Sequence, residues 1–246
     1  MAAETSQASG LPTTGLLLIG MGLGRLEGMT HEALQAAAAA DHRRYEAYTA
    51  LWPEAELARL ETQVGAIQRV MRPEVEEPDE LLALAKTSLV ALLVVGDPLQ
   101  ATTHVDLQLR AISAGVECRV FHGLSITTLV TGAVGLSNYK FGRQTTFTYP
   151  YGGWVATSPL EVVAVNWAQN LHTLALLDLD PTGQGTGDQR PMTPSDAAHA
   201  MRLMWAKLRD ADVDDASLGD GVQASKHVMI ARYLQQPMEE MPVVLC

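Results

Sequence analysis

Short apolar runs recur along the chain, and each is followed by glycines or another turn signal. The first is Leu16–Ile19 and the second is Leu89–Val95. Uninterrupted apolar runs of this length are typical of strands that are buried on both faces of a parallel sheet. A third candidate strand, Cys118–Phe121, follows a helical pattern that Gly115 closes. Strand, turn, helix and strand in this order predict βαβ units, with helices on both faces of the sheet.

Helical patterns fill the segments between these strands. Thr30 is an N-cap candidate that opens THEALQAAAAADHRRY, an alanine-rich stretch that we expect to be helical. Leu57, Leu60 and Val64 recur at helical spacing and predict a helix over residues 54–70. Further helices are expected over residues 78–86 and 103–114.

The second half of the chain has more aromatic, threonine and glycine residues. It predicts an extended segment over residues 145–149, a helix over 160–169 and an apolar strand over 171–179 that ends at an aspartate. A flexible loop is expected over residues 180–191, and a helix begins at Thr193 with Pro194 as its first residue. We therefore expect a disordered extension over residues 1–13 and two α/β domains, over residues 14–121 and 122–246.

Composition narrows the class of protein. Of the 246 residues, 47% are hydrophobic and 18% are charged, which is typical of a soluble globular chain with room for two modest domains. No apolar run reaches the roughly 18 residues of a membrane span. The first residues have no basic n-region or apolar core, so we expect no secretory signal and a cytoplasmic location.

Charge and metal-binding residue types exclude further classes. The net charge of -11 argues against binding to nucleic acid or to anionic membranes, because both need a basic surface. Cys118 and Cys246 form no CxxC pair, and the seven histidines show no HExxH spacing. We therefore expect no disulfide framework and no metal.

The turn Gly20–Gly24 after the first strand invites comparison with a dinucleotide site. In open α/β sheets, ligands bind beyond the carboxyl ends of the strands. The third glycine of GxGxxG, however, would fall at Arg25, and the DHRRYEAY stretch that follows is not an apolar strand. The spacing therefore disfavours NAD or FAD, and a tight turn without a ligand remains an alternative.

Asp97 follows the second strand and lies between Gly96 and Pro98. A carboxylate there could accept hydrogen bonds from ribose hydroxyls or from an amino group, or it could cap the following turn or helix. Thr103 is an equally good N-cap for that helix, and His104 could simply be a residue of its first turn. Pattern alone leaves these alternatives open.

Ser125 follows the third strand. Its hydroxyl and its backbone N–H could face a ligand, or the side chain could cap the next helix. No serine or cysteine nucleophile signature accompanies it. The residues therefore indicate a binding edge rather than a catalytic triad.

Taken together, several segments resemble one known family. LLLIGMGLG, LLVVGDPLQATTH, FHGLSI and LHTLALLDLD occur in this order. The chain is similar, from about Leu16 to Leu208, to the diphthine synthase family, which belongs to the tetrapyrrole-methylase-like S-adenosylmethionine methyltransferases. GDP followed by ATTH, and then HTL with LLD, is the specific part of the resemblance.

The resemblance implies a fold, a reaction and a cofactor. The fold has two αβα domains with S-adenosylmethionine in the cleft between them, usually in a homodimer. The reaction is methylation of the amino group of a modified histidine on translation elongation factor two, in diphthamide biosynthesis, with trimethylation expected. No catalytic side chain is implied, because the sulfonium of the cofactor is already reactive. The implied cofactor-binding residues are Leu23, Asp97, Gln100, Ser125, Ile126 and Leu177.

Two departures from the family keep alternatives open. Gln100 stands where the family usually has glycine, so its side chain must point away from the cofactor or replace a water. Towards the C-terminus, VDDASLG (213–219) replaces an apolar strand, and Pro242 stands where the family has histidine. The chain could therefore be a non-catalytic, cofactor-binding relative. A methyltransferase of the same class that acts on a corrin or porphyrin precursor is the other alternative.

Overall fold

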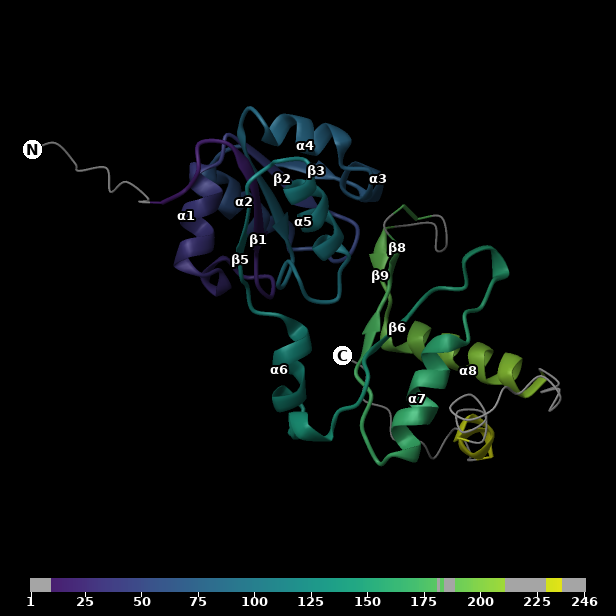
Figure 1. Ribbon diagram of the computed structural model, residues 1–246. Helices are drawn as coiled ribbons and strands as arrows, with labels where there is room; N and C mark the ends of the chain where they lie inside the picture. Colours follow the sequence, from purple (N-terminus) through teal and green to yellow (C-terminus); the bar gives the residue numbers. More distant parts are fainter. Residues whose placement is uncertain (1–9, 181, 184–188, 211–228, 236–246) are drawn as a thin grey trace, which may run out of the picture. The chain divides into compact units, whose positions relative to one another are not determined.

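The protein forms two compact units in a computed structural model that describes residues 10–180, 182–183, 189–210 and 229–235. The first unit comprises Met1–Leu129 and the second Val130–Cys246 (Figure 1). Part of the extension expected over residues 1–13 lies outside the described residues, and so do VDDASLG and Pro242. Each unit is described by itself.

The first unit is built on a parallel sheet of five strands in the order β3-β2-β4-β1-β5. The predicted parallel sheet is thereby confirmed. The two central strands contain the longest apolar runs, and all of their residues are buried. The strands are β1 (Gly15–Gly20), β2 (His42–Glu46), β3 (Gln68–Val70), β4 (Leu89–Val94) and β5 (Cys118–Phe121).

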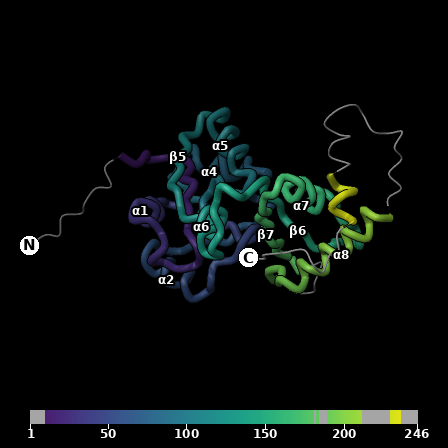
Figure 2. Tube along the Cα trace, turned by 90° about the horizontal axis from the view of Figure 1, so that it is seen from below, coloured from purple at the N-terminus to yellow at the C-terminus, as the bar shows by residue number. Residues whose placement is uncertain are grey.

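Helices cover both faces of this sheet. Helices α1 (His31–Ala39) and α2 (Glu54–Val64) pack on one face, with Leu17 and Ile19 of β1. Helices α3 (Arg72–Glu76), α4 (Asp79–Ala85) and α5 (His104–Ser113) pack on the other face, with Leu16 and Leu18 (Figure 2). Successive side chains of a strand point to opposite faces, so one apolar run supplies both cores.

The structure corrects the prediction for THEALQAAAAADHRRY. Thr30 caps α1 as expected, since its hydroxyl accepts from the N–H of Ala33 at 3.1 Å. The helix ends at Ala39, however, and residues 42–46 form strand β2. The side chain of Arg43, on this strand, donates to the carbonyls of Ala37, Ala38 and Ala40. It therefore caps the C-terminal end of the helix. Because most residues of this strand are polar, the hydrophobic pattern does not predict its extended conformation.

The helix predicted over residues 54–70 is also shorter in the structure. It ends at Val64, because Gly65 adopts a φ of +92° that breaks the helix. Residues 68–70 then form the edge strand β3 beside β2.

The second unit contains shorter strands and a more aromatic core. The strand predicted over residues 171–179 is shorter and divided, since Ala175–Leu177 form one strand and Leu179–Asp180 belong to another. Between them, the N–H of Asp178 donates to the carbonyl of Phe147, and the carbonyl of Asp178 accepts from the N–H of Met192. Phe147, Trp205 and Tyr233 lie in the core. The strands are β6 (Thr145–Phe147), parallel to β7 (Ala175–Leu177), and β8 (Leu179–Asp180), antiparallel to β9 (Arg190–Pro191). The helices are α6 (Ile126–Ala133), which crosses the division between the units, α7 (Ser158–Ala168) and α8 (Pro194–Asp210).

Short 3-10 turns complete the described elements: η1 (Leu26–Gly28), η2 (Asn138–Lys140) and η3 (Tyr151–Gly153). In the part of the chain that the structure describes, no helix is both long and apolar enough to cross a membrane.

Candidate functional site

Three glycines bring the carboxyl ends of β1, β4 and β5 into contact. A Cβ on Gly123 would lie 2.3 Å from the carbonyl oxygen of Gly96 and 2.9 Å from the Cα of Gly20. Real Cβ atoms do not approach backbone atoms this closely, so Gly123 and Gly20 leave no room for a side chain, and Gly96 adopts a φ of +78° that favours glycine. Gly22 and Gly96 exchange two backbone hydrogen bonds, of 3.1 and 2.9 Å. The loops after the three strands are therefore held together by their backbones.

Asp97 lies on this edge and is 7% exposed. Its Oδ1 accepts from the N–H of Leu99 at 2.9 Å. Its Oδ2 lies 2.8 Å from Nδ1 of His122 and accepts from the N–H of Gly123 at 3.2 Å. The carboxylate therefore caps its own turn and also joins the end of β4 to the end of β5. A carboxylate offers about four lone-pair positions, so these three contacts leave one for a ligand.

Ser125 caps helix α6, as one of its two interpretations predicted. Its Oγ accepts from the N–H of Thr127 at 3.3 Å and lies 2.8 Å from Oγ1 of that residue. The N–H of Ile126 has no hydrogen-bond partner among the described residues, and its side chain is 43% exposed. The first turn of α6 therefore presents a free donor at the positive end of the helix dipole.

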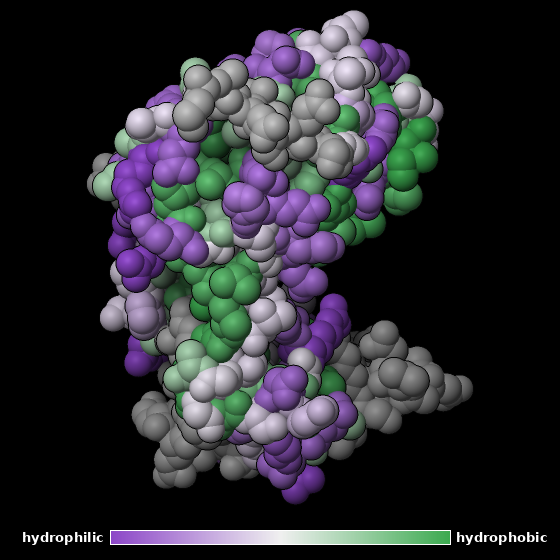
Figure 3. All heavy atoms as spheres, turned by 90° about the vertical axis from the view of Figure 1, so that its left-hand side faces the viewer, coloured by the Kyte–Doolittle hydropathy of each residue, from purple (hydrophilic) through white to green (hydrophobic). Residues whose placement is uncertain are grey.

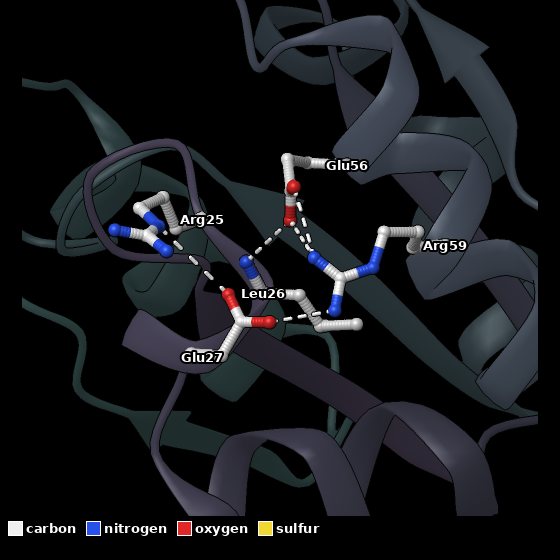
Figure 4. Close-up of polar contacts among 5 residues, drawn as sticks. All are labelled: Arg25, Leu26, Glu27, Glu56 and Arg59. Atoms are coloured by element: carbon white, nitrogen blue, oxygen red, sulfur yellow. Dashed lines mark hydrogen bonds and ion pairs between the residues drawn. The ribbon is translucent and has the colours of Figure 1, made fainter.

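The loop after β1 carries Leu23, which is 43% exposed. A network of ion pairs and hydrogen bonds fastens this loop to α2 (Figure 4). Oε2 of Glu56 accepts from the N–H of Leu26 at 2.9 Å, and Arg59 bridges Glu56 at 2.9 Å and Glu27 at 2.6 Å. The hydrogen bond from Leu26, and then the Arg59 guanidinium, lower the pKa of the Glu56 carboxyl. The anchor therefore stays charged at neutral pH.

Gln100 and Leu177 complete the set of predicted cofactor residues. The N–H of Gln100 donates to the carbonyl of Asp97 at 3.2 Å, and the residue is exposed. Leu177 ends strand β7, in the second unit. The structure thus brings five of the six residues together at one edge of the first unit. They are Leu23, Asp97, Gln100, Ser125 and Ile126.

Three polar residues at or behind this edge were not predicted to take part. His122 contacts Asp97, although the sequence marked it only as part of a turn. Glu46 and His104 form a buried pair, with Nε2 and Oε2 2.8 Å apart. The spacing of GDP and FHG after neighbouring strands could have indicated the first contact. No local signal indicates the second, because Glu46 belongs to the strand that pattern analysis missed.

These residues fit S-adenosylmethionine. A carboxylate with a free acceptor position suits ribose hydroxyls or an ammonium group, and a free N–H at a helix start suits a carboxylate. Apolar residues are exposed near these polar groups in the sequence. Figure 3 shows one face of the molecule, on which hydrophobic residues, in green, lie among hydrophilic ones, in purple. The apolar side chains nearest in sequence are Leu23, Leu124, Ile126 and Leu129. Within the described residues, no group of three or more His, Cys, Asp or Glu side chains could hold a metal ion.

Cavities of several hundred Å³ lie away from the strand-end edge in each unit. The second unit has one of about 600 Å³, beside Arg143, Glu161 and Asn166. The first unit has a cavity of about 540 Å³ beside α3 and α4 and one of about 370 Å³ beside α3 and α5. Predicted cofactor residues line none of these three, so the strand-end edge remains the candidate site on chemical grounds rather than on volume.

Comparison with known proteins supports the same family. A family model for tetrapyrrole (corrin/porphyrin) methylases matches residues 15–218. A diphthine synthase of Methanospirillum hungatei JF-1 is 35% identical over 166 residues, which cover 67% of this chain and 66% of that relative. One of Methanoregula boonei is 34% identical over 198 residues, which cover 80% of this chain and 76% of that relative. The chain thus spans about two thirds of the length of the first relative.

Solved structures agree with these relatives. A crystal structure of diphthine synthase has a TM-score of 0.68 at 33% identity, and the match covers 79% of this chain and 73% of that one. A conserved hypothetical protein from Aeropyrum pernix K1 has a TM-score of 0.70 at 30% identity, with coverage of 80% and 66%. The predicted α/β fold of the tetrapyrrole methylase type is confirmed. The family also confirms the predicted class of enzyme, which is a methyltransferase. The chain belongs to the tetrapyrrole methylase family and, within it, to the diphthine synthases, which are S-adenosylmethionine-dependent methyltransferases.

Proposed function

We propose that this chain methylates the amino group of a modified histidine on translation elongation factor two, in diphthamide biosynthesis, and that it adds three methyl groups. The observation that carries the proposal is the edge where β1, β4 and β5 end, which gathers five of the six residues implied by the family. S-adenosylmethionine supplies, when bound, a methyl group on a sulfonium that needs no further activation.

The residues of this edge would bind and orient the cofactor. The free acceptor position of Asp97 suits a ribose hydroxyl or the ammonium group. The N–H of Ile126 suits the carboxylate, because it lies at the positive end of α6. Leu23 and the Ile126 side chain supply apolar surface that excludes water. Leu177, from the second unit, is proposed as the sixth contact.

Catalysis then depends on alignment more than on acid or base chemistry. The substrate amine has to arrive unprotonated and in line with the methyl group, which is the contribution of orientation. His104 does not serve as the base, because it is 1% exposed and both of its ring nitrogens face groups of the protein. We assign no side chain to proton removal.

Calorimetric titration of S-adenosylmethionine tests the binding step. Asp97→Ala is expected to weaken binding at least tenfold, because it removes the acceptor that joins β4 to β5. Asp106→Ala is the matched control, since that aspartate is exposed on α5 and pairs only with Arg110 in the described contacts. Circular dichroism of each variant verifies folding. A folded wild-type chain that binds no cofactor would refute the proposal.

A turnover assay tests the reaction and the alternatives. Elongation factor two that carries a 3-amino-3-carboxypropyl group on its histidine is incubated with the chain and the cofactor, and mass spectrometry counts the added methyl groups. Three are expected, and a fourth would indicate a methyl ester. Binding without turnover would identify a non-catalytic relative. Turnover of a corrin or porphyrin precursor instead would favour the activity that gives the family model its description.

The proposal includes a homodimer in the cytoplasm, where translation takes place. Sedimentation at micromolar concentration tests the oligomeric state. A single species with the mass of one 26.5 kDa chain would contradict the dimer.

A further inference from the structure

A buried ionisable pair lies behind the loop that carries Asp97. Glu46 ends β2 and is 2% exposed, and His104 begins α5 and is 1% exposed. Nε2 of His104 lies 2.8 Å from Oε2 of Glu46, at the distance of an ion pair but without the alignment of a hydrogen bond. The other ring nitrogen, Nδ1, lies 3.1 Å from the carbonyl oxygen of Pro98. One imidazole thus connects the sheet, the helix and the loop.

Each ring nitrogen of the imidazole faces a polar atom of the protein. A carbonyl oxygen can only accept, so Nδ1 must carry a hydrogen that it donates to Pro98. Nε2 of the same ring lies 2.8 Å from Oε2 of Glu46, so each of these buried polar atoms faces the other. Removal of either partner would leave the other buried and uncompensated.

The contact with Pro98 acts on the conformation of the loop. Pro98 has no N–H, so its carbonyl is the only backbone hydrogen-bonding group with which it can be held. The residues on either side of Pro98 form the turn that Asp97 caps, through the N–H of Leu99 at 2.9 Å. A shift of the Pro98 carbonyl would therefore turn the Asp97 carboxylate away from His122 and Gly123.

The pair is buried beside a cavity of about 370 Å³, which His104 lines together with Val75 and Leu107. Tyr48 is buried, and burial, followed by the charge of Glu46, raises the pKa of its hydroxyl. The guanidinium of Arg72 lies 4.8 Å from the centre of the Tyr48 ring. Apolar side chains of similar volume would fill such a place at no lower stability. An ionisable pair here therefore calls for a reason other than packing.

We propose that His104, held by Glu46, is a positioning residue for the cofactor site, and that it acts through the Pro98 carbonyl to orient Asp97. This inference rests on the proposed function, because the orientation of Asp97 matters through the cofactor. His104 itself touches no substrate.

Two substitutions separate the two contacts of the imidazole. In His104→Asn the amide nitrogen takes the place of Nδ1 and can still donate to Pro98, but Glu46 loses its partner. In His104→Gln the amide nitrogen takes the place of Nε2 and can still donate to Glu46, but Pro98 loses its donor. The variant with the higher unfolding temperature is expected to have the weaker affinity for S-adenosylmethionine. His104→Gln unfolds at the higher temperature of the two and binds S-adenosylmethionine at least tenfold more weakly than the wild type, whereas His104→Asn stays within threefold.

Glu46→Gln supplies a rescue test. The glutamine amide can donate to Nε2 of a neutral imidazole whose Nδ1 keeps its hydrogen, so cofactor affinity is expected to stay within threefold of the wild type. If His104→Asn does not fold because Glu46 is left unpaired, the double variant Glu46→Gln, His104→Asn removes that charge and takes its place in the comparison.

The outcomes are distinct. Affinity that follows the order of unfolding temperature, or that is unchanged in both His104 variants, overturns the inference and leaves the pair with a structural role only. Failure of the wild type to bind would refute the proposed function instead. Hydrogen exchange at the Leu99 amide then still decides whether His104 positions the loop, since protection should survive in His104→Asn and fall in His104→Gln.

Discussion

The two units solve the problem of building a core in different ways. In the first unit, six-residue apolar strands lie side by side, and backbone contacts between glycines join their ends. In the second unit, strands have only two or three residues, and the core combines aliphatic side chains with the aromatic rings of Phe147, Tyr149, Trp205 and Tyr233. Tyr233 lies between Trp167 and Trp205, with ring centroids 5.7 and 5.1 Å away.

This difference indicates what each unit tolerates. The first unit positions its ligand edge with backbone atoms, which cannot move aside for an added side-chain atom. The second unit depends on the volume of large side chains, which surrounding residues only partly replace when it is lost. The first unit should therefore be sensitive to added atoms at its edge, and the second to atoms removed from its core.

The largest effect is expected for Gly123→Ala. The added Cβ would meet only backbone atoms, at 2.3 Å from Gly96 and 2.9 Å from Gly20, so the strand ends would have to separate. We expect a loss of about 3 kcal/mol or more in the free energy of unfolding, measured by urea denaturation. Gly132→Ala is the matched control, because its Cβ would meet nothing within 4 Å in α6, and the change should be below about 1 kcal/mol. Equal losses would contradict the comparison.

Trp205→Ala tests the second unit by removing side-chain atoms from its core. The indole is 7% exposed and packs against Tyr233, so its removal should cost about 3–5 kcal/mol. Trp154→Ala removes an indole that is 67% exposed and should cost less than about 1 kcal/mol. Amide exchange in β1 and β4 should be unchanged in both variants at temperatures where the second unit stays folded. Loss of protection in those strands would show that the cores are not independent.

His122→Ala sharpens the role of backbone contacts at the edge. The imidazole is mostly exposed, and Asp97 would keep its bonds to the N–H groups of Leu99 and Gly123. We expect a loss of less than about 1 kcal/mol in unfolding free energy by urea denaturation, because the buried carboxylate keeps two backbone hydrogen bonds. A loss comparable to that of Gly123→Ala would mean that this side chain, and not the glycines, holds the strand ends together.

The smallest effect is expected for Glu56→Ala, which removes the anchor of the loop after β1. Because the folded protein lowers the pKa of this carboxyl below its ordinary value of 4.5, the anchor contributes above about pH 4.5 and is lost as the pH falls through the lowered value. The Leu26 amide should exchange faster in the variant at neutral pH, and the difference should shrink in acid. A difference independent of pH would exclude the charged carboxylate as its cause.

Elements with a local pattern of apolar residues could be predicted from the sequence, and elements whose residues serve contacts with distant segments could not. The strands β1 and β4 could be predicted because their apolar runs are uninterrupted. Strand β2 could not, because Arg43 and Glu46 make it polar, and both serve contacts outside the strand. The gathering of Leu23, Asp97 and Ser125 followed from a general property of parallel sheets, whose carboxyl ends share one edge.

The sequence by itself determined the apolar strands, the glycine turns after them, and the family through GDP, ATTH and LLD. Only the tertiary structure decided which groups Asp97 contacts and which groups the imidazole of His104 faces. The physical reason is that a hydrogen bond requires a partner within about 3 Å, and that partner here comes from another strand or loop. The residue type at one position limits the bonds it can make, and the packing of distant segments selects among them.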